Sequence, residues 1–343
     1  MVIPEFWKSE LSEIDEVVLS VKKGKVTTVK SAGGRPIHFI EYGKRNKFER
    51  QANYSSACGA GNLKSYADKT GENIRPTVFL VGAIHGAEVE GTCALLNLIS
   101  VIETGKDLSG KENSTFSKIT DEVNLLIIPC ANPDGRARFP KKSAIGMTID
   151  EFRYYAQGTW KNGLLAGWPD CKKVHPIKNA ADYLGAYYND DGINMMHDNF
   201  SFLMSEETKF LLKIADSFVP DITILLHGCA GARSELLMPK AVHKYFKDEA
   251  YTFSKELVER CKKQGMSLTL STPLYGDDEP VHSYNLVSAI TNICGELCST
   301  YECNQGLEDS KHKISYEDMY KQHMILFELA CEYAKNKLKA THS

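Results

Sequence analysis

Continuous apolar runs alternate along the chain with segments of helical spacing. The runs at 77–84, 123–130 and 221–228 are almost wholly apolar, as in "VNLLIIPC" and "DITILLHG". Such runs are typical of parallel strands that are covered by helices on both faces. Helical patterns occur at about 88–103 and 205–217. The alternation predicts an α/β fold with a mixed, mostly parallel sheet between helices.

Shorter sequence patterns predict the remaining helices and strands. A long amphipathic helix is expected at the C-terminal end, with Ser315 as its N-cap. Further strands are expected at 17–21, 26–30, 36–42, 266–271, 289–295 and 298–303, and further helices at 241–264 and 280–290.

Two long polar stretches interrupt the regular pattern. Residues 44–75 are polar with scattered glycines, and residues 132–200 are rich in Gly, Asn, Pro and Tyr. Irregular stretches of this length are usually functional or lid-like. We therefore expect one catalytic domain over residues 1–343 with insertions at about 44–75 and 136–192. The length and polarity of 44–75 favour a segment that covers the mouth of a site.

Composition and charge argue against nucleic-acid binding and against a membrane-spanning protein. The chain has 343 residues, of which 43% are hydrophobic and 25% charged, and a formal net charge of −3. This balance is ordinary for a globular protein and offers no basic field for nucleic acid. No apolar run approaches the roughly 18 residues of a membrane span. We expect neither nucleic acid nor a membrane among the partners, and composition leaves the oligomeric state unknown.

The ten cysteines are scattered and form no Cys-x-x-Cys pair. This pattern favours a reducing compartment over a disulfide scaffold, and the N-terminal residues lack a secretory pattern. We therefore expect a cytoplasmic protein. The spacing of Cys294, Cys298 and Cys303 fits no common thiolate metal site.

Candidate chemistry lies where two apolar runs end. His85 follows the run at 77–84, and His227 lies at the end of the run at 221–228. Carboxyl ends of parallel strands meet at one edge of a sheet, where ligands bind. Glu88 follows His85 by three residues at the start of a helix. Two imidazoles and one carboxylate, with a fourth position open to water, are the ligands of a catalytic zinc ion.

Each part of this interpretation has an alternative. A lone His-x-x-Glu is more often the capped start of a helix, and Glu90 competes with Glu88 as the carboxylate ligand. A catalytic zinc site also needs a base outside the ligand set. Glu302, at the end of the strand at 298–303, fits that role, and Glu296 is the alternative if the last strand lies elsewhere.

Five segments, in order, resemble the M14 family of zinc carboxypeptidases. They are "SAGGRPIHFIEYG", "IHGAEVEG", "PCANPDGRAR", "SEETKFLLKIADSFVPDITILLHG" and "TYECNQG". The resemblance implies a zinc carboxypeptidase-like (phosphorylase/hydrolase-like) fold with an eight-stranded mixed sheet. It also implies that His85, Glu88 and His227 bind one zinc ion per chain, and that Glu302 is the general base and acid.

The chain departs from the family in the segment "GINMMHDNF". Typical members carry an Asn-Arg pair there, and the arginine grips the terminal carboxylate of the substrate. Here Met196 and His197 are interpreted as replacing that pair. His197 is then either a substitute contact for an anion or an ordinary loop histidine.

The resemblance also implies an arginine that polarises the substrate carbonyl and a tyrosine that closes over the substrate. Arg136 and Arg138 directly follow the Asn-Pro-Asp-Gly turn, and Arg153 and Lys161 are further candidates. The tyrosine candidates are Tyr275 and Tyr284, which packing alone would explain equally well.

These features predict a zinc-dependent hydrolase that cleaves an amide bond. The first hypothesis is a metallocarboxypeptidase that releases C-terminal residues from peptides. The second is a zinc deacylase or amidase that acts on N-acyl amino acids or cell-wall fragments, which the missing Asn-Arg pair favours. A non-catalytic binding protein on the same fold is the third.

Overall fold

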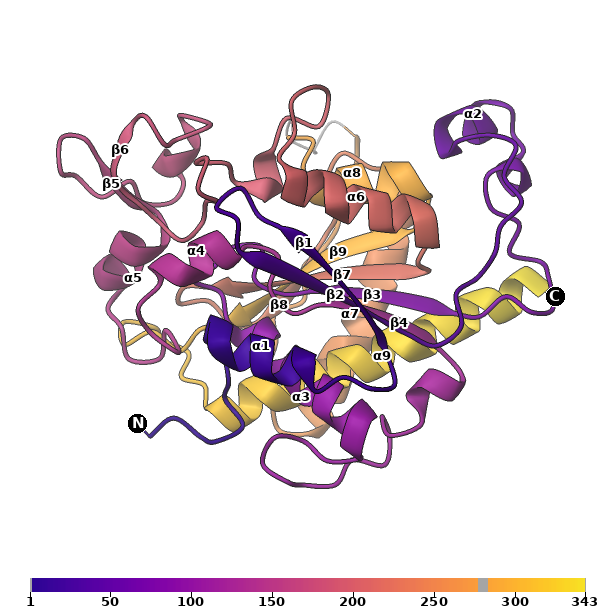
Figure 1. Cartoon of the computed structure of the whole chain (residues 1–343), viewed down its shortest axis with the longest axis horizontal. Helices are drawn as coiled ribbons and strands as arrows, with labels where there is room; N and C mark the ends of the chain where they lie inside the picture. The colour runs from indigo at the N-terminus through magenta and orange to yellow at the C-terminus, as the bar shows by residue number, and fades with distance from the viewer. Residues whose placement is uncertain (1, 277–282, 343) are drawn as a thin grey trace.

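One mixed sheet forms the centre of the computed structural model, which describes residues 2–276 and 283–342 (Figure 1). Its strands run in the order β1-β2-β4-β3-β7-β9-β8. The strands are β1 (Lys25–Lys30), β2 (Pro36–Tyr42), β3 (Thr77–Val81), β4 (Asn124–Ile128), β7 (Ile222–Cys229), β8 (Glu235–Leu237) and β9 (Leu297–Asn304). The four central strands are parallel, whereas β1, β2 and β8 pair antiparallel. The predicted α/β class is confirmed, but this sheet has seven strands within the described residues, not eight.

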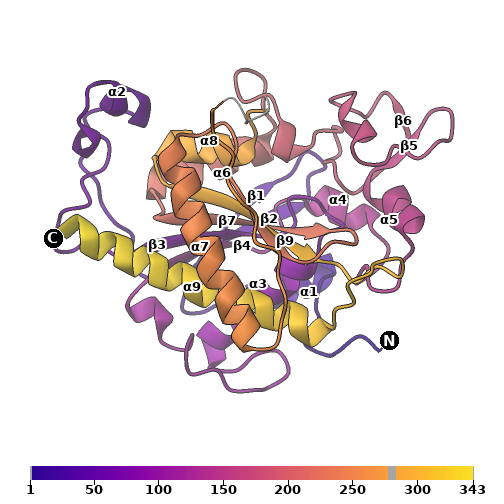
Figure 2. The same cartoon turned by 180° about the vertical axis from the view of Figure 1, so that it is seen from behind.

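Helices cover both faces of the sheet (Figures 1 and 2). On one face lie α1 (Leu11–Leu19), α3 (Glu90–Thr104), α7 (Lys244–Lys263) and α9 (Tyr316–His342), and on the other lie α6 (Glu206–Phe218) and α8 (Leu286–Cys294). Successive residues of a strand alternate between the two cores: Val78 and Leu80 of β3 belong to the first, and Phe79 and Val81 to the second. Burial of both faces explains why the central strands are continuously apolar in sequence.

Three predicted strands are wrong. Residues 17–21 overlap the end of α1, where Ile14, Val17 and Val18 are buried at helical spacing. Residues 289–295 are mostly the helix α8, which a capping box starts at Asn285 and a left-handed Gly295 ends. Between 266 and 271 there is no strand, and Thr269 forms an isolated bridge with Glu235. The part of the predicted helix at 280–290 that precedes Ser283 lies outside the described residues.

The excursion at 44–75 lies at the amino ends of the central strands, opposite to the predicted site. It contains α2 (Tyr54–Gly59), which projects far from β5 and β6 (Figure 1). Lys69 Nζ lies 2.6 Å from Asp221 and 2.7 Å from Glu296, two carboxylates that directly precede β7 and β9. His227 and Glu302 lie toward the other ends of these strands. The expectation that this excursion covers the site is therefore wrong.

The second insertion stands beside the carboxyl ends of the central strands. It follows α4 (Pro133–Arg138) and contains α5 (Ile149–Ala156) and the small antiparallel pair β5 (Gly158–Trp160) and β6 (Ala181–Leu184). A short 3₁₀ turn at Asp170–Lys172 and another at Met195–His197 lead the chain back toward α6.

Within the described ranges, no helix has both the length and the apolar character needed to cross a bilayer. All ten cysteines are free, and the cytoplasmic location stays a prediction.

Candidate active site

The loop after β3 carries His85 into position by packing tightly on the Asn-Pro-Asp-Gly turn. A Cβ on Gly86 would lie 2.0 Å from the backbone nitrogen of Arg136, so this close approach requires glycine. The backbone nitrogen of Asn132 donates to the Ala83 carbonyl at 3.0 Å. Ala83 itself has a φ of 45°, which turns the chain sharply between strand and histidine. The turn motif therefore supports the loop that carries the first predicted ligand.

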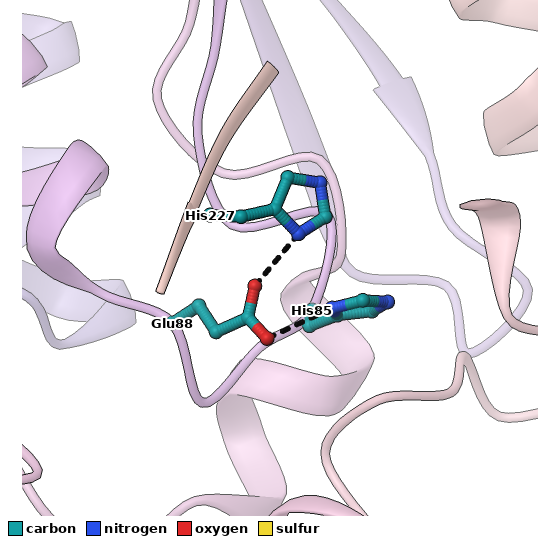
Figure 3. Close-up of side chains that lie close together, drawn as sticks. All are labelled: His85, Glu88 and His227. Carbon is teal, nitrogen blue, oxygen red and sulfur yellow. Dashed lines mark hydrogen bonds and ion pairs between the residues drawn. The ribbon is translucent and has the colours of Figure 1, made fainter. Parts of the chain in front are cut away.

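His85, Glu88 and His227 meet at this point, and all three are buried (Figure 3). The Nδ1 atoms of His85 and His227 lie 2.9 Å and 2.8 Å from the two oxygens of the Glu88 carboxylate. One potential ligand atom from each residue lies within 4.8 Å of the others. Two imidazole nitrogens and one carboxylate oxygen suit Zn²⁺, so the donor set and its spacing fit the predicted ion.

The protonation state of Glu88 suits a metal ligand. Burial alone would raise its pKa, but the two imidazoles outweigh burial and hold the pKa of Glu88 below its usual value. A metal ligand has to be deprotonated, and this carboxylate stays so through the neutral range.

The ring of His85 is held from two sides. Its Nε2 lies 3.1 Å from the Asn194 side-chain oxygen, and its plane stacks on Tyr187 with centroids 3.9 Å apart and 4° between planes. An Nε2–H that donates to Asn194 leaves the Nδ1 lone pair free to bind a metal. The sequence analysis missed both partners.

Glu302 lies beside His227 because the two residues are direct partners in the β7–β9 register. Its partly exposed side chain lines the same cavity as the three predicted ligands. Burial raises the pKa of Glu302 to about 8, opposed by His227 and assisted by the carboxylates of Glu88 and Glu235. A pKa near neutrality is suited to a group that both accepts and donates a proton.

The two competing carboxylates lie elsewhere. Glu296 precedes β9 at its other end and forms ion pairs with Lys69 and Lys337, each at 2.7 Å. Glu90 is buried in the first turn of α3, where one oxygen accepts from Gln305 at 3.5 Å and the other has no hydrogen-bond partner. Burial raises the pKa of Glu90 to about 8. Of the two carboxylates after His85, Glu88 is the one that contacts His227.

A cavity of about 800 Å³ opens over these residues. His85, Glu88, His227 and Glu302 line one part of it. The second insertion contributes Phe152, Arg153, Trp168, Lys172 and Tyr187, and later segments add Glu235, Lys240 and Ser271. The strands thus supply the candidate chemical groups, and the insertion supplies a wall.

Neither arginine that directly follows the turn motif lines this cavity. Arg136 is buried and donates to the carbonyls of Ser9 and Phe139 at 2.7 Å each. Arg138 pairs with Asp190 and donates to the Tyr188 carbonyl. These contacts use both guanidinium groups to fix neighbouring loops. Of the four cations considered from the sequence, Arg153 alone is among the residues that line the cavity in the described structure.

His197 does line the cavity, but it has no charge to offer an anion at neutral pH. Burial and the nearby ammonium of Lys172 lower the pKa of His197 to about 4. The segment also places Asn194, not Met196, against His85. If Asn194 is matched with the asparagine of the family pair, Met195 stands where the arginine would be, so this segment lacks the arginine in either register.

The two candidate tyrosines do not line the cavity. The Tyr275 hydroxyl donates to Asp248 on α7. Tyr284 is 46% exposed and its ring lies 5.8 Å from that of Phe200. Residues 277–282, between these tyrosines, lie outside the described structure.

Residues 21–168 match the profile of the zinc carboxypeptidases, Peptidase M14. The match contains His85 and Glu88 and ends before His227 and Glu302. A comparison with curated proteins found no match.

Solved structures share the fold at low sequence identity. A metallo-carboxypeptidase from Burkholderia cenocepacia has a TM-score of 0.57 and 14% identity, with 95% of this chain and 68% of that one covered. One from Pseudomonas aeruginosa, in complex with (2-guanidinoethylmercapto)succinic acid, has a TM-score of 0.56 and 10% identity, with 95% and 68% covered. Carboxypeptidase A from Helicoverpa armigera has a TM-score of 0.52 and 13% identity, with 98% and 75% covered.

Proposed function

We propose that the chain is a member of the M14 family of zinc carboxypeptidases, whose profile residues 21–168 match, and that it is a metallocarboxypeptidase that releases C-terminal residues from peptides. The observation that carries this proposal is the meeting of His85, Glu88 and His227 beside Glu302 in one cavity. The first three residues offer an N/N/O ligand set, and the fourth is a carboxylate outside that set.

The proposed reaction is the addition of water to a peptide bond. Zinc bound by His85, Glu88 and His227 supplies a Lewis acid for the carbonyl and makes water more acidic. Glu302 accepts a proton from the attacking water as the oxygen–carbon bond forms. It then gives that proton to the leaving nitrogen as the carbon–nitrogen bond breaks. Its raised pKa, about 8, supports both halves of this exchange.

An exopeptidase must also hold the terminal carboxylate at a fixed distance from the reacting bond. Arg153 is the arginine that lines the cavity in the described structure, and its contact with Asp150 is a long 3.7 Å. Its side chain is 41% exposed, so it is accessible to substrate. We propose that the Arg153 guanidinium binds the terminal carboxylate, because a planar fork matches a carboxylate in two hydrogen bonds.

Paired substrates test this function. A peptide with a free C-terminus should be cleaved faster than the same peptide with an amidated C-terminus, by roughly 10- to 100-fold in kcat/KM, the value of a charged hydrogen bond. Arg153→Gln should remove most of that difference, whereas Lys161→Gln, at an exposed position that does not line the cavity, should keep it. Equal rates for acid and amide in the wild type would rule out a carboxypeptidase.

Deacylation of N-acyl amino acids is the second candidate, and the missing Asn-Arg pair favours it. These substrates also carry a free carboxylate, so Arg153 would serve both reactions. Hydrolysis of simple N-acyl amino acids with no cleavage of longer peptides would decide for the second candidate.

A further inference from the structure

Two lysines line the cavity in addition to Arg153. Lys172 ends the 3₁₀ turn of the insertion, and Lys240 follows β8. Within the described residues, neither lysine has an acidic partner at ion-pair distance, although Lys173 next to Lys172 lies 2.8 Å from Asp170. Two exposed lysines from separate segments therefore border one cavity, and neither has an ion-pair partner among the described residues.

Lys172 is exposed and stands beside an aromatic ring. Its Nζ lies 5.2 Å from the centre of the Trp168 ring, which itself lines the cavity. An ammonium over an indole face is a favourable cation–π contact. Burial lowers the pKa of Lys172, Cys171 and Glu302 oppose this shift, and the positive charge of Lys240 adds to it.

The carboxylates of the cavity have other contacts or roles. Glu88 lies between two imidazoles. Glu235 accepts a hydrogen bond from Ser271 at 2.5 Å. Glu302 is the proposed base. This leaves the two lysines available to a ligand.

We infer that Lys172 and Lys240 bind a second anionic group on the substrate, and that the preferred substrate ends in glutamate or aspartate. The inference rests on the proposed function. One terminal carboxylate is matched by the single guanidinium of Arg153, so two further cations match the side-chain carboxylate of the same residue. Charged groups that lack a partner in a cavity favour ligands with the complementary charge.

Peptides that end in Glu or in Gln test the inference, because these residues have the same shape and differ in charge. The wild type should prefer Glu by at least about tenfold in kcat/KM, since a charge-assisted hydrogen bond contributes on this scale. The double variant Lys172→Gln/Lys240→Gln should lose this preference, because its kcat/KM should fall much more for the Glu peptide than for the Gln peptide. Lys173→Gln, the matched control, should keep the preference.

Binding provides a second measurement that does not depend on turnover. Calorimetry with N-acetylglutamate and N-acetylglutamine should show tighter binding of the dicarboxylate to the wild type and equal binding to the double variant. If peptides ending in Glu and Gln are cleaved equally, the carboxypeptidase proposal stands and the second-anion subsite is wrong. If no peptide is cleaved, the proposed function fails, and equal binding of the two ligands to the wild type would overturn the subsite as well.

Discussion

Glu88 and Glu302 lie in the same cavity but in opposite environments. Two imidazoles neutralise the cost of burying Glu88, and its pKa falls. Glu302 has one neighbouring imidazole and several neighbouring carboxylates, and its pKa rises to about 8. The first environment favours a permanently charged ligand, and the second favours a group that exchanges protons.

This difference predicts distinct effects of substitution. Glu302→Gln should retain zinc and lose about 10²- to 10⁴-fold in kcat, the usual contribution of a general acid–base. His227→Ala should lose zinc, because one ligand of three is removed. Metal analysis of the purified proteins together with kcat separates the two effects. Glu302→Gln protein that fails to hold zinc would contradict the assignment of Glu302 to a role outside the ligand set.

The candidate ligands and base could be selected from sequence because each lies at or near the end of an apolar strand, and the structure brings them into one cavity. His227 and Glu302 become partners simply because β7 and β9 are parallel neighbours in register. Lys172 and Lys240 gave no such signal, since both belong to irregular segments whose position depends on tertiary packing. The same limit applies to the arginine proposed to bind the substrate carboxylate, Arg153. Proximity to the turn motif favoured Arg136, but the Arg136 guanidinium binds backbone carbonyls.

At the scale of elements, a buried ion-pair network fixes the excursion at 44–75 to the sheet. Lys69 joins Asp221 before β7 to Glu296 before β9, and Glu296 also pairs with Lys337 of α9. All four side chains are at least four-fifths buried, with exposed fractions of 12%, 3%, 13% and 19%. Lys69 thus links the amino ends of two central strands to the long insertion.

Lys69→Met should lower the free energy of unfolding by about 3 kcal/mol, because it leaves two buried carboxylates short of a counter-charge. Zinc content and kcat of the folded protein should change little, since the network lies at the opposite ends of the strands from His227 and Glu302. Urea unfolding followed by circular dichroism measures the first effect. Lys64→Met, at an exposed position of the same excursion, is the control, and an equal loss of stability in both variants would refute the role of the network.

Helices and strands were predicted correctly where burial produces a clear sequence pattern. They were predicted wrongly where a few residues, taken without their neighbours, resemble another type of element. The central strands are buried on both faces, and their apolar runs show this directly. The five residues 17–21 resemble a strand in isolation, but their helical partner Ile14 lies outside that window. In α8, β-branched residues resemble a strand, yet the cap at Asn285 makes them a helix.

At the scale of the whole molecule, buried histidines make stability depend on pH. His323 of α9 is fully buried, its Nδ1 lies 2.7 Å from the Met319 carbonyl, and its Nε2 has no hydrogen-bond partner. Burial lowers the pKa of His323 to about 4, whereas an unfolded histidine titrates near about 6.5. Between these values the unfolded chain binds a proton that the folded chain does not.

The contribution of His323 to the free energy of unfolding should therefore be complete above about pH 6.5. It should decline as the pH falls toward 4, by up to about 3 kcal/mol. His323→Leu should flatten that decline, and His312→Gln, at a partly exposed position, should leave it unchanged. Denaturant unfolding at several pH values, with a chelator present so that metal release does not contribute, gives the slopes. An unaltered slope in His323→Leu would show that other groups cause the acid sensitivity.

The wall of the cavity and its chemical groups come from different parts of the chain. His227 and Glu302 are fixed by the register of the sheet, whereas Arg153, Trp168 and Lys172 belong to an insertion outside it. The register that places His227 beside Glu302 therefore does not depend on the insertion. We expect a chimera that carries this sheet with a different insertion to cleave the same kind of bond in a different set of substrates. Substrate selectivity could then be changed by replacing the insertion alone.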